Sequence, residues 1–204
     1  MYSELALYID GKWLNGEGRK GEDVINPANG KTLAHLPHAS KADLDAALAA
    51  AEKGFAVWKA TSAYDRAKIL RKAADLVRER HDHISKVMTQ EQGKVYVESR
   101  AEVLTSADII DWYAEEGRRT YGRVVPGRQK GVRQLVLQEP VGVVAAFTPW
   151  NFPTLTPVRK IAGALAAGCS VIIKASEETP GGCVELVKCF ADAGLPAGVL
   201  NMVF

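Results

Sequence analysis

Two short polar segments of this chain each follow an apolar run, and their residues could perform chemistry together. The apolar residues 141–147 precede a turn that contains Asn151, and the apolar residues 170–174 end on Lys174, with Glu177 close behind. A side-chain amide can donate to a developing negative charge, and a carboxylate beside an ammonium can bind sugar hydroxyls. If both runs are strands of one sheet, these groups meet at one edge, where open α/β sheets bind their ligands.

The position of Glu177 indicates a nucleotide ligand. In a nucleotide-binding sheet, an acidic side chain just past the second strand accepts hydrogen bonds from the ribose hydroxyls, and Lys174 can donate to the same hydroxyls. A carboxylate there would repel a 2′-phosphate, so NAD is favoured as the cofactor, with NADP as the alternative. The same two residues would also suit an exposed turn, in which an ion pair contributes little stability. On spacing alone, both interpretations stay open.

The usual phosphate-binding loop does not occur in this pattern. A Gly-x-Gly-x-x-Gly motif would be expected after the first apolar run, where it would cradle a pyrophosphate. The chain instead has the sequence Pro149-Trp150-Asn151-Phe152-Pro153. This difference indicates a variant of the dinucleotide-binding fold rather than an ordinary member.

The elements that must position these residues alternate between strand and helix. In the last third of the chain we expect strands at Val141–Phe147, Ser170–Lys174 and Val199–Phe204, separated by helices at about 153–167 and 180–194. Continuous apolar strands alternating with amphipathic helices are typical of a parallel sheet with right-handed crossovers. The third strand would lie at an unpaired edge of that sheet.

The preceding part of the chain predicts a β-hairpin followed by helices. Leu7-Tyr8-Ile9 and Lys12-Trp13-Leu14 flank the turn signal Asp10-Gly11. Ser40 and Ser62, each with an aspartate three residues later, resemble helix N-caps. The helices that we expect from these caps and from the apolar spacing lie at about 40–58, from 62 onward, at 81–93 and at 95–121.

These expectations divide the chain into three parts of an α/β fold. Residues 1–122 form a β-hairpin and the helical part of a cofactor-binding domain, 123–139 form a protruding β arm, and 140–204 form a βαβαβ nucleotide-binding unit. The arm is predicted because Pro126-Gly127 and Lys130-Gly131 punctuate short extended runs. Such arms often pair with another subunit, but a plain surface hairpin would have the same pattern.

Composition and charge exclude several classes of protein. A net charge of +2 does not indicate a nucleic-acid or membrane partner, and no apolar run reaches the roughly 18–20 residues that span a bilayer. The N-terminus lacks the basic and apolar regions of a signal peptide, so we expect a cytoplasmic protein.

We expect no metal site, since neither the histidines nor the cysteines have metal-ligand spacing. The cysteines are interpreted as small buried hydrophobes, and they are Cys169, Cys183 and Cys189.

Three motifs, in this order and spacing, resemble the aldehyde dehydrogenase superfamily. They are the segments Thr148–Pro153, Leu165–Cys169 and Lys174–Pro180. The resemblance covers essentially all 204 residues. It implies the N-terminal part of an aldehyde dehydrogenase-like fold, built on a variant Rossmann sheet, and the NAD(P)-dependent oxidation of an aldehyde to a carboxylic acid.

The resemblance also assigns roles to individual residues. Asn151 matches the asparagine whose side-chain amide helps form the oxyanion hole, although without the family a plain turn asparagine would be expected. Lys160 matches a helix lysine near the catalytic centre, although a surface lysine would fit the same pattern. The residues that match the cofactor-binding segments are Phe147, Thr148, Pro149, Trp150, Asn151, Lys174, Ala175, Ser176 and Glu177.

Arg159 indicates which kind of aldehyde would be bound. It lies eight residues after Asn151, and in the succinate-semialdehyde dehydrogenase branch an arginine at the corresponding place binds the substrate carboxylate. A guanidinium suits this task because it makes paired, planar hydrogen bonds. We therefore expect a semialdehyde such as succinate semialdehyde, with Phe152 also on the substrate side. A solvated pair of Arg159 and Lys160 on a helix face stays an alternative.

Part of the family's catalytic machinery is not found in this sequence. The family's mechanism needs a cysteine nucleophile and a glutamate that activates water, and neither of the corresponding motifs occurs up to Phe204. We therefore expect the N-terminal portion of a longer enzyme, inactive by itself, that forms a homodimer or homotetramer. The alternative is a non-catalytic nucleotide-binding or assembly protein derived from the same fold.

Overall fold

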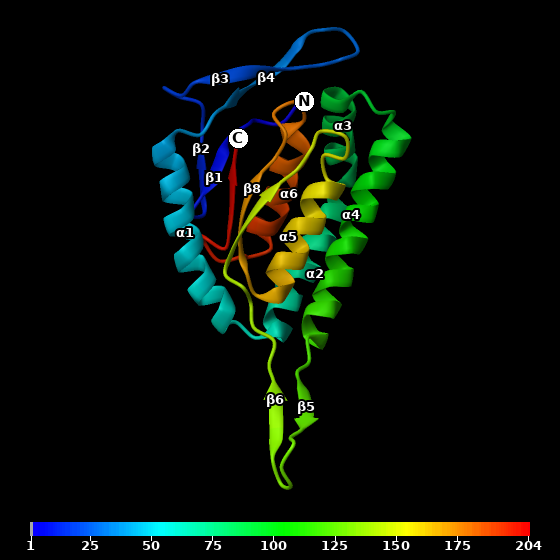
Figure 1. Cartoon of the computed structure of the whole chain (residues 1–204). Coiled ribbons are helices and arrows are strands. Elements are labelled where there is room, and N and C mark those ends of the chain that lie inside the picture. Colours follow the sequence, from blue (N-terminus) through cyan, green and yellow to red (C-terminus); the bar gives the residue numbers. More distant parts are fainter. Residues whose placement is uncertain (1) are drawn as a thin grey trace.

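The structure is a computed structural model that describes residues 2–204. Within that range, strands begin the chain, helices follow, and strands and helices alternate towards its end (Figure 1). In chain order the elements are β1 (Leu7–Ile9), β2 (Lys12–Leu14), β3 (Gly21–Ile25), β4 (Thr32–Pro37), α1 (Lys41–Ala60), α2 (Ala63–Glu79), α3 (His81–Gln92), α4 (Tyr96–Glu116), a 3-10 turn (Gly117–Arg119), β5 (Arg123–Pro126), β6 (Arg133–Val136), β7 (Val143–Phe147), α5 (Leu155–Ala167), β8 (Ser170–Lys174), α6 (Pro180–Asp192) and β9 (Leu200–Val203).

A five-stranded sheet in the order β2-β1-β9-β8-β7 forms the centre of the fold. Strands β7, β8 and β9 run parallel, as predicted, with Phe147 opposite Lys174 and Lys174 opposite Val203. The predicted unpaired edge at the third strand is wrong, because β1 pairs antiparallel with β9 through Tyr8 and Met202. The N-terminal hairpin therefore covers β9, and β7 is the outermost parallel strand of the sheet.

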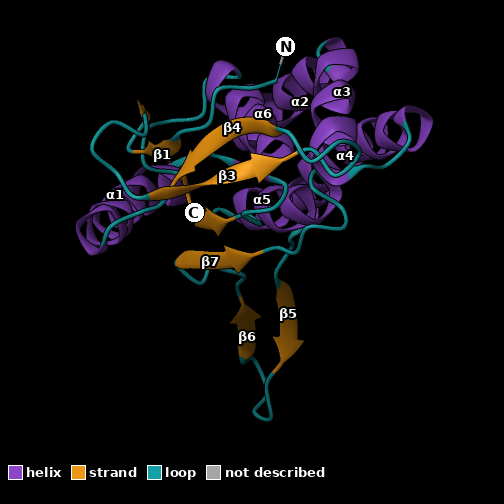
Figure 2. Cartoon of the chain, turned by 90° about the horizontal axis from the view of Figure 1, so that it is seen from above, coloured by secondary structure: helices purple, strands orange, loops and turns teal. Residues whose placement is uncertain are grey.

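Helices cover both faces of this sheet. In Figure 1, α1 lies on one side, whereas α5 and α6 lie on the other, with α2 and α4 beyond them. Figure 2 shows the same layers from above, with the β3–β4 hairpin lying across them. The crossover helices α5 and α6 share one face because right-handed connections join three strands in consecutive order.

The layers are held together by apolar packing along helix faces that the sequence predicts. The buried face of α2 carries Leu70, Ala73 and Val77. At the end of α1, the fully buried Trp58 donates its indole Nε1–H to the carbonyl oxygen of Leu165 at 2.8 Å. Removing a buried aromatic side chain of this size typically costs about 3–5 kcal/mol, so Trp58 is a main tie between α1 and α5.

The predicted starts of α1 and α2 are confirmed by their caps. The hydroxyl oxygen of Ser40 accepts from the backbone N–H of Asp43 at 3.2 Å, and that of Ser62 accepts from Asp65 at 3.1 Å. The Asp43 carboxylate also accepts from the backbone of Ser40 at 2.8 Å, which completes a capping box.

Two other predicted boundaries differ from the structure. Helix α4 ends at Glu116 rather than near Tyr121, because the next residues tighten into a 3-10 turn. Strand β7 begins at Val143 rather than Val141, because Gly142 has a φ of +126° that breaks the extended run.

The predicted hairpin arm is confirmed as a separate two-stranded sheet. Strands β5 and β6 pair antiparallel, with Arg123 opposite Val136, and project away from the body of the molecule (Figure 1). Their apolar side chains are not buried: Val124, Leu135 and Leu137 are 65%, 70% and 73% exposed. Exposed apolar groups on a projecting hairpin are a surface that another polypeptide can cover.

A buried carboxylate holds the start of α6. Glu91 on α3 accepts the backbone N–H groups of Gly181 and Gly182 at 2.7 and 2.8 Å, and it also accepts the hydroxyl of Tyr2. Burial raises the pKa of Glu91 to about 7, against the opposing effect of the three hydrogen bonds. Ionisation of this one side chain should therefore influence stability near neutral pH.

Replacing Glu91 by glutamine should reduce the pH dependence of stability. Because its folded-state pKa of about 7 lies above the ordinary 4.5, the stability that Glu91 contributes is full below pH 4.5 and is lost as the pH rises through 7. Across that window, the free energy of urea unfolding should fall by roughly 3 kcal/mol more in the wild type than in Glu91→Gln. The exposed change Glu98→Gln on α4 is the control, and it should leave the wild-type slope unaltered. Equal slopes for wild type and Glu91→Gln would contradict this prediction.

Candidate functional site

The two polar segments singled out in the sequence lie side by side at the carboxyl edge of the sheet. Phe147, the last residue of β7, is paired with Lys174, the last residue of β8. One residue later, the backbone N–H of Thr148 donates to the carbonyl oxygen of Lys174 at 3.2 Å. The parallel register thus delivers the turn after β7 and the turn after β8 to one place, which is the ligand-binding position of open α/β sheets.

Lys174 and Glu177 form an ion pair on the rim of this edge, and each side chain is about one-third exposed (33% and 34%). Partial burial acts to raise the pKa of the Glu177 carboxyl. The hydrogen bonds from Lys174 and from the backbone N–H of Glu177, together with nearby positive charge, outweigh burial and hold that pKa below its ordinary value. Glu177 therefore carries a full negative charge at neutral pH. Between the two, Ala175 and Ser176 are buried, so this turn presents the charged pair and the exposed Glu178 to solvent.

Aromatic side chains dominate the turn after β7. Phe147, Trp150 and Phe152 are 68%, 54% and 42% exposed, which is unusual for side chains so close to a buried sheet. The carbonyl oxygen of Trp150 accepts from the Thr179 hydroxyl at 3.2 Å, which ties this turn to the start of α6. Thr148 is buried, and within residues 2–204 its hydroxyl has no hydrogen-bond partner. The edge thus offers flat apolar surfaces to a ligand, with one unpartnered hydroxyl buried just beneath them.

Asn151 lies at the exposed tip of the same turn. Its backbone oxygen accepts from the Lys94 ammonium at 3.2 Å. Its side chain is exposed, and among residues 2–204 no hydrogen bond engages its amide, so both N–H donors are free to meet a ligand. Lys160 and Arg159 lie further along, on α5, and both are exposed.

A shallow groove of about 430 Å³ runs beside Asn151. Helix α4 and the start of α5 form its walls, and the surface is mostly apolar. Phe152 lines the groove, whereas Arg159 and Lys160 do not. The lining residues are Lys94, Glu98, Ala101, Glu102, Thr105, Asn151, Phe152 and Leu155.

Glu102 supports the candidate site, and the sequence does not single it out. Its Oε1 accepts the backbone N–H groups of Thr154 and Leu155 at 3.0 and 3.1 Å, so it caps α5 from a neighbouring helix. Its Oε2 pairs with Lys94 at 2.6 Å. No sequence signal links Glu102 to Thr154, because the two are 52 residues apart and only the packing of α4 on α5 brings them together.

The starts of α5 and α6 are therefore both occupied by protein carboxylates. Helix N-termini commonly bind phosphates through their free backbone N–H groups and their positive dipole end. Here Glu102 and Glu91 accept the first such groups of α5 and α6. A dinucleotide at this edge would need another group to hold its pyrophosphate, which agrees with the lack of a Gly-x-Gly-x-x-Gly loop after β7.

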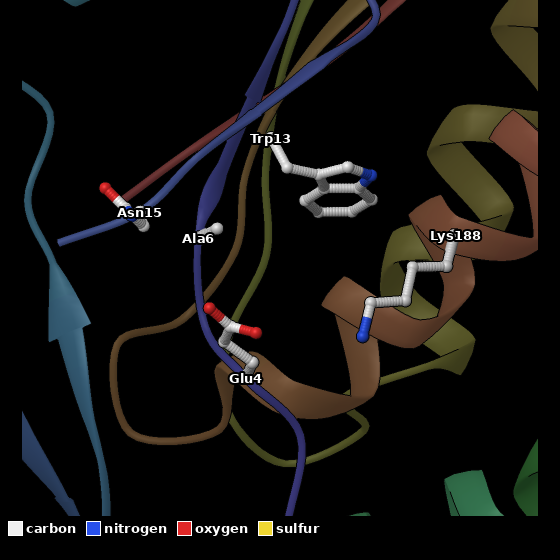
Figure 3. Close-up of a pocket in the computed structure, with 5 residues that line it drawn as sticks. All are labelled: Glu4, Ala6, Trp13, Asn15 and Lys188. Atoms are coloured by element: carbon white, nitrogen blue, oxygen red, sulfur yellow. The ribbon is translucent and has the colours of Figure 1, made fainter.

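A second pocket, of about 360 Å³, lies between the N-terminal strands and α6 (Figure 3). Figure 3 shows the Trp13 ring above it, the Lys188 side chain on the right and Glu4 below. The Lys188 ammonium is 5.9 Å from the centre of the Trp13 ring and donates to Glu185 at 2.8 Å. None of the residues in the turns directly after β7 and β8 lines this pocket, so it is separate from the carboxyl edge.

The cysteines are buried thiols, as the sequence predicts. Burial raises the pKa of Cys183 and of Cys189 to about 12, so both stay protonated at neutral pH, and Cys169 is also buried. A protonated, inaccessible thiol is a poor nucleophile.

Within residues 2–204 we find no cluster of three metal-ligating side chains. None of the helices in this range has the length and apolar character of a membrane span.

Comparison with known proteins finds aldehyde dehydrogenases that are similar to this chain over nearly all of its length. The sequence profile of the Aldehyde dehydrogenase family matches residues 13–204. Succinate-semialdehyde dehydrogenase [NADP(+)] GabD of Escherichia coli is 42% identical over 203 residues, which is 100% of this chain and 42% of that protein. Glutarate-semialdehyde dehydrogenase of Pseudomonas putida is 40% identical, over 96% of this chain and 41% of that protein.

Solved structures are equally similar. The crystal structure of an aldehyde dehydrogenase from Brucella melitensis biovar abortus 2308 superposes with a TM-score of 0.96 and 42% identity, over 99% of this chain and 42% of that one. The crystal structure of an Escherichia coli NADP-dependent enzyme gives a TM-score of 0.95 and 41% identity, over 98% and 42%. The chain thus spans about 42% of the length of these relatives. With its parallel β7–β8 edge, its Lys174–Glu177 pair and its asparagine turn, the chain belongs to the aldehyde dehydrogenase family.

Proposed function

We propose that this chain supplies the cofactor edge and the oxyanion donor for the NAD(P)-dependent oxidation of an aldehyde to a carboxylic acid. The observation that carries the proposal is the juxtaposition of Asn151, after β7, with Lys174 and Glu177, after β8, at one sheet edge. The family relationship adds support, since its named relatives are dehydrogenases that act on aldehydes.

The residues of this edge suit a dinucleotide. Lys174 can donate to the ribose hydroxyls and the ionised Glu177 can accept from them, while the exposed Phe147 and Trp150 can flank flat parts of the cofactor. The unpartnered hydroxyl of Thr148 is a further polar group at the same edge. The bound cofactor would supply the hydride acceptor for the oxidation.

Asn151 is proposed to act on the substrate. When a nucleophile adds to an aldehyde, negative charge develops on the aldehyde oxygen, and a pre-positioned amide N–H stabilises that charge. Lys160, on the following helix, is proposed to lie near the same centre. The three cysteines are buried, so a nucleophile supplied from outside residues 2–204 is part of the proposal.

The substrate is proposed to be a semialdehyde, an aldehyde with a distal carboxylate. Arg159 is exposed on α5 and free to bind such a carboxylate with paired hydrogen bonds, and Phe152 would contact the chain between the two ends. Two relatives are named for succinate and glutarate semialdehydes, which have this chemistry.

NAD is proposed as the preferred cofactor, with NADP as the second candidate. The charge on Glu177 would repel a 2′-phosphate bound at the same ribose, which favours NAD. NADP is considered because the Escherichia coli relative is named for it. The buried free cysteines suit the reducing cytoplasm that the sequence predicts.

The assembly is proposed to be a homodimer or homotetramer that contacts through the arm, residues 123–139. The apolar side chains exposed on β5 and β6 support this proposal.

We also propose that the chain divides into residues 1–122, the arm and residues 140–204. If no aldehyde chemistry is found, the alternative is a nucleotide-binding or assembly role for the same fold.

Asn151→Ala should slow the oxidation itself. In an active enzyme that contains this chain, loss of one oxyanion donor should lower kcat by about 10²–10³-fold, because the charge that it stabilises exists mainly in the transition state. The readout is NADH formation with succinate semialdehyde, with the exposed turn change Asn29→Ala as control. An unchanged kcat in Asn151→Ala would remove the oxyanion role.

Glu177→Ser should shift cofactor preference towards NADP. Removing the carboxylate removes the repulsion of the 2′-phosphate, so the Kd for NADP should fall by about tenfold or more, while the Kd for NAD rises modestly. Titration of each cofactor by fluorescence measures both values. The neighbouring Glu178→Ser changes net charge equally and should leave the ratio near that of the wild type. The same NAD-to-NADP ratio in wild type and Glu177→Ser would contradict the proposal.

Arg159→Ala should weaken the binding of substrates that carry a carboxylate. Loss of a charged pair of hydrogen bonds should raise the KM for succinate semialdehyde by about 10–100-fold and leave an uncharged aliphatic aldehyde little affected. Steady-state kinetics with both aldehydes measure the difference, and Arg100→Ala, an exposed change on α4, is the control. An equal rise in the KM for both aldehydes would show that Arg159 does not bind the substrate carboxylate.

A further inference from the structure

A buried ion pair lies directly behind the turn that carries Asn151. The Lys94 ammonium is 2.6 Å from the Glu102 carboxylate, and the two side chains are only 11% and 3% exposed. Lys94 precedes α4 and Glu102 lies within it, so both belong to a different layer from the sheet edge. Buried charges are expensive unless they are paired and hydrogen-bonded, so a pair at this position calls for an explanation.

Lys94 holds one end of the turn. Its ammonium donates to the backbone oxygen of Asn151 at 3.2 Å and lies 4.3 Å from the centre of the Phe152 ring. One cation thus contacts two consecutive residues, the first of which carries the candidate oxyanion donor. Holding the carbonyl of Asn151 restrains the peptide plane that follows this residue, and so restricts where its Cα and side chain can lie.

Glu102 holds the other end of the turn. Its Oε1 accepts the N–H of Thr154, the hydroxyl of Thr154 and the N–H of Leu155, at 3.0, 3.1 and 3.1 Å. The Thr154 hydroxyl oxygen also accepts a hydrogen bond from the Ser106 hydroxyl on α4 at 3.2 Å. The segment from Asn151 to Leu155 is therefore tied to α4 at both ends through one ion pair.

Capping of α5 alone does not account for the contacts that Lys94 makes beyond Glu102. Glu91 caps α6 with two similar backbone bonds, and its additional partner is the neutral Tyr2 hydroxyl rather than a cation. Glu91 thus caps α6 without a cation, but with a pKa that burial raises to about 7. The cation beside Glu102 differs in that it reaches past the helix start to Asn151 and Phe152.

We propose that Lys94 and Glu102 are positioning residues that hold the Asn151 amide in the orientation needed to stabilise the oxyanion. This inference rests on the proposed function of Asn151 and adds the residues through which its placement is set. Catalytic donors must be held within a fraction of an ångström of the productive geometry, and small displacements cost large factors in rate. The pair acts through Asn151 and does not itself contact the reacting atoms.

Lys94→Met tests the proposal in an active enzyme that contains this chain. The substitution keeps much of the side-chain volume but removes the link to Asn151, so kcat should fall by about 10–100-fold while the KM for the cofactor stays near that of the wild type. The control is Lys86→Met, which breaks an exposed pair with Asp82 on α3 and should leave kcat unaltered. A kcat for Lys94→Met equal to that of the control would overturn the proposal.

A second variant guards against misfolding. Lys94→Met alone leaves the Glu102 carboxylate buried without its cation, which can destabilise the fold. The double variant Lys94→Met/Glu102→Gln leaves no unpaired charge, and the glutamine oxygen can still accept from Thr154 and Leu155. With thermal unfolding and near-ultraviolet circular dichroism like those of the wild type, this variant should still show the fall in kcat. A native-like double variant with wild-type kcat would overturn the proposal.

The Asn151→Ala background separates positioning from general damage. If Lys94 acts through Asn151, then Lys94→Met should cause little further loss of kcat once the amide is gone, and the two effects should be strongly non-additive. Fully additive losses would show that Lys94 acts on something else. A wild-type kcat for Asn151→Ala itself would instead overturn the oxyanion role, and the positioning inference with it, which identifies the step that failed.

Discussion

The parallel pairing of β7 with β8 is the constraint on which the rest of the site depends. The register sets Phe147 opposite Lys174, so both strands end at the same level and both following turns begin there. The hydrogen bond from Thr148 to Lys174 carries the pairing one residue into the first turn. A register shift of one residue would turn Lys174 to the other face of the sheet and separate it from this turn.

Carboxyl groups on α3 and α4 hold the helix starts at that edge of the sheet. Two glutamates from adjacent helices, Glu91 and Glu102, occupy the first backbone N–H groups of α6 and α5. These groups are where many nucleotide-binding folds receive a phosphate. In this chain they serve to anchor the turns instead, and the glycine-rich loop after the first strand is replaced by a rigid, proline-flanked turn with exposed aromatic rings. The N–H groups at the starts of α5 and α6 thus anchor the turns, and a phosphate would have to be bound by other groups.

The same packing separates this chain's buried cysteines from its chemistry. Cys183 and Cys189 lie on α6 inside the core, where burial keeps both thiols protonated. The edge itself presents amide, carboxylate, ammonium and guanidinium groups, which bind and orient but do not attack a carbonyl carbon. In the proposed function, these groups would bind and position the cofactor and the aldehyde.

Local patterns in the sequence determined most of the elements and the place of the edge. The alternation of apolar strands and amphipathic helices, the serine caps at Ser40 and Ser62, and the run from Lys174 to Glu177 each depend on neighbouring residues only. Tertiary structure alone decided that β1 would cover β9, and that Lys94 and Glu102 would hold the turn at Asn151. These contacts join residues far apart in the chain. Burial stabilises the pairing of β1 with β9, whereas the mutual attraction and hydrogen bonds of Lys94 and Glu102 offset the cost of desolvating both charges. Neither effect leaves a periodic signal in the sequence.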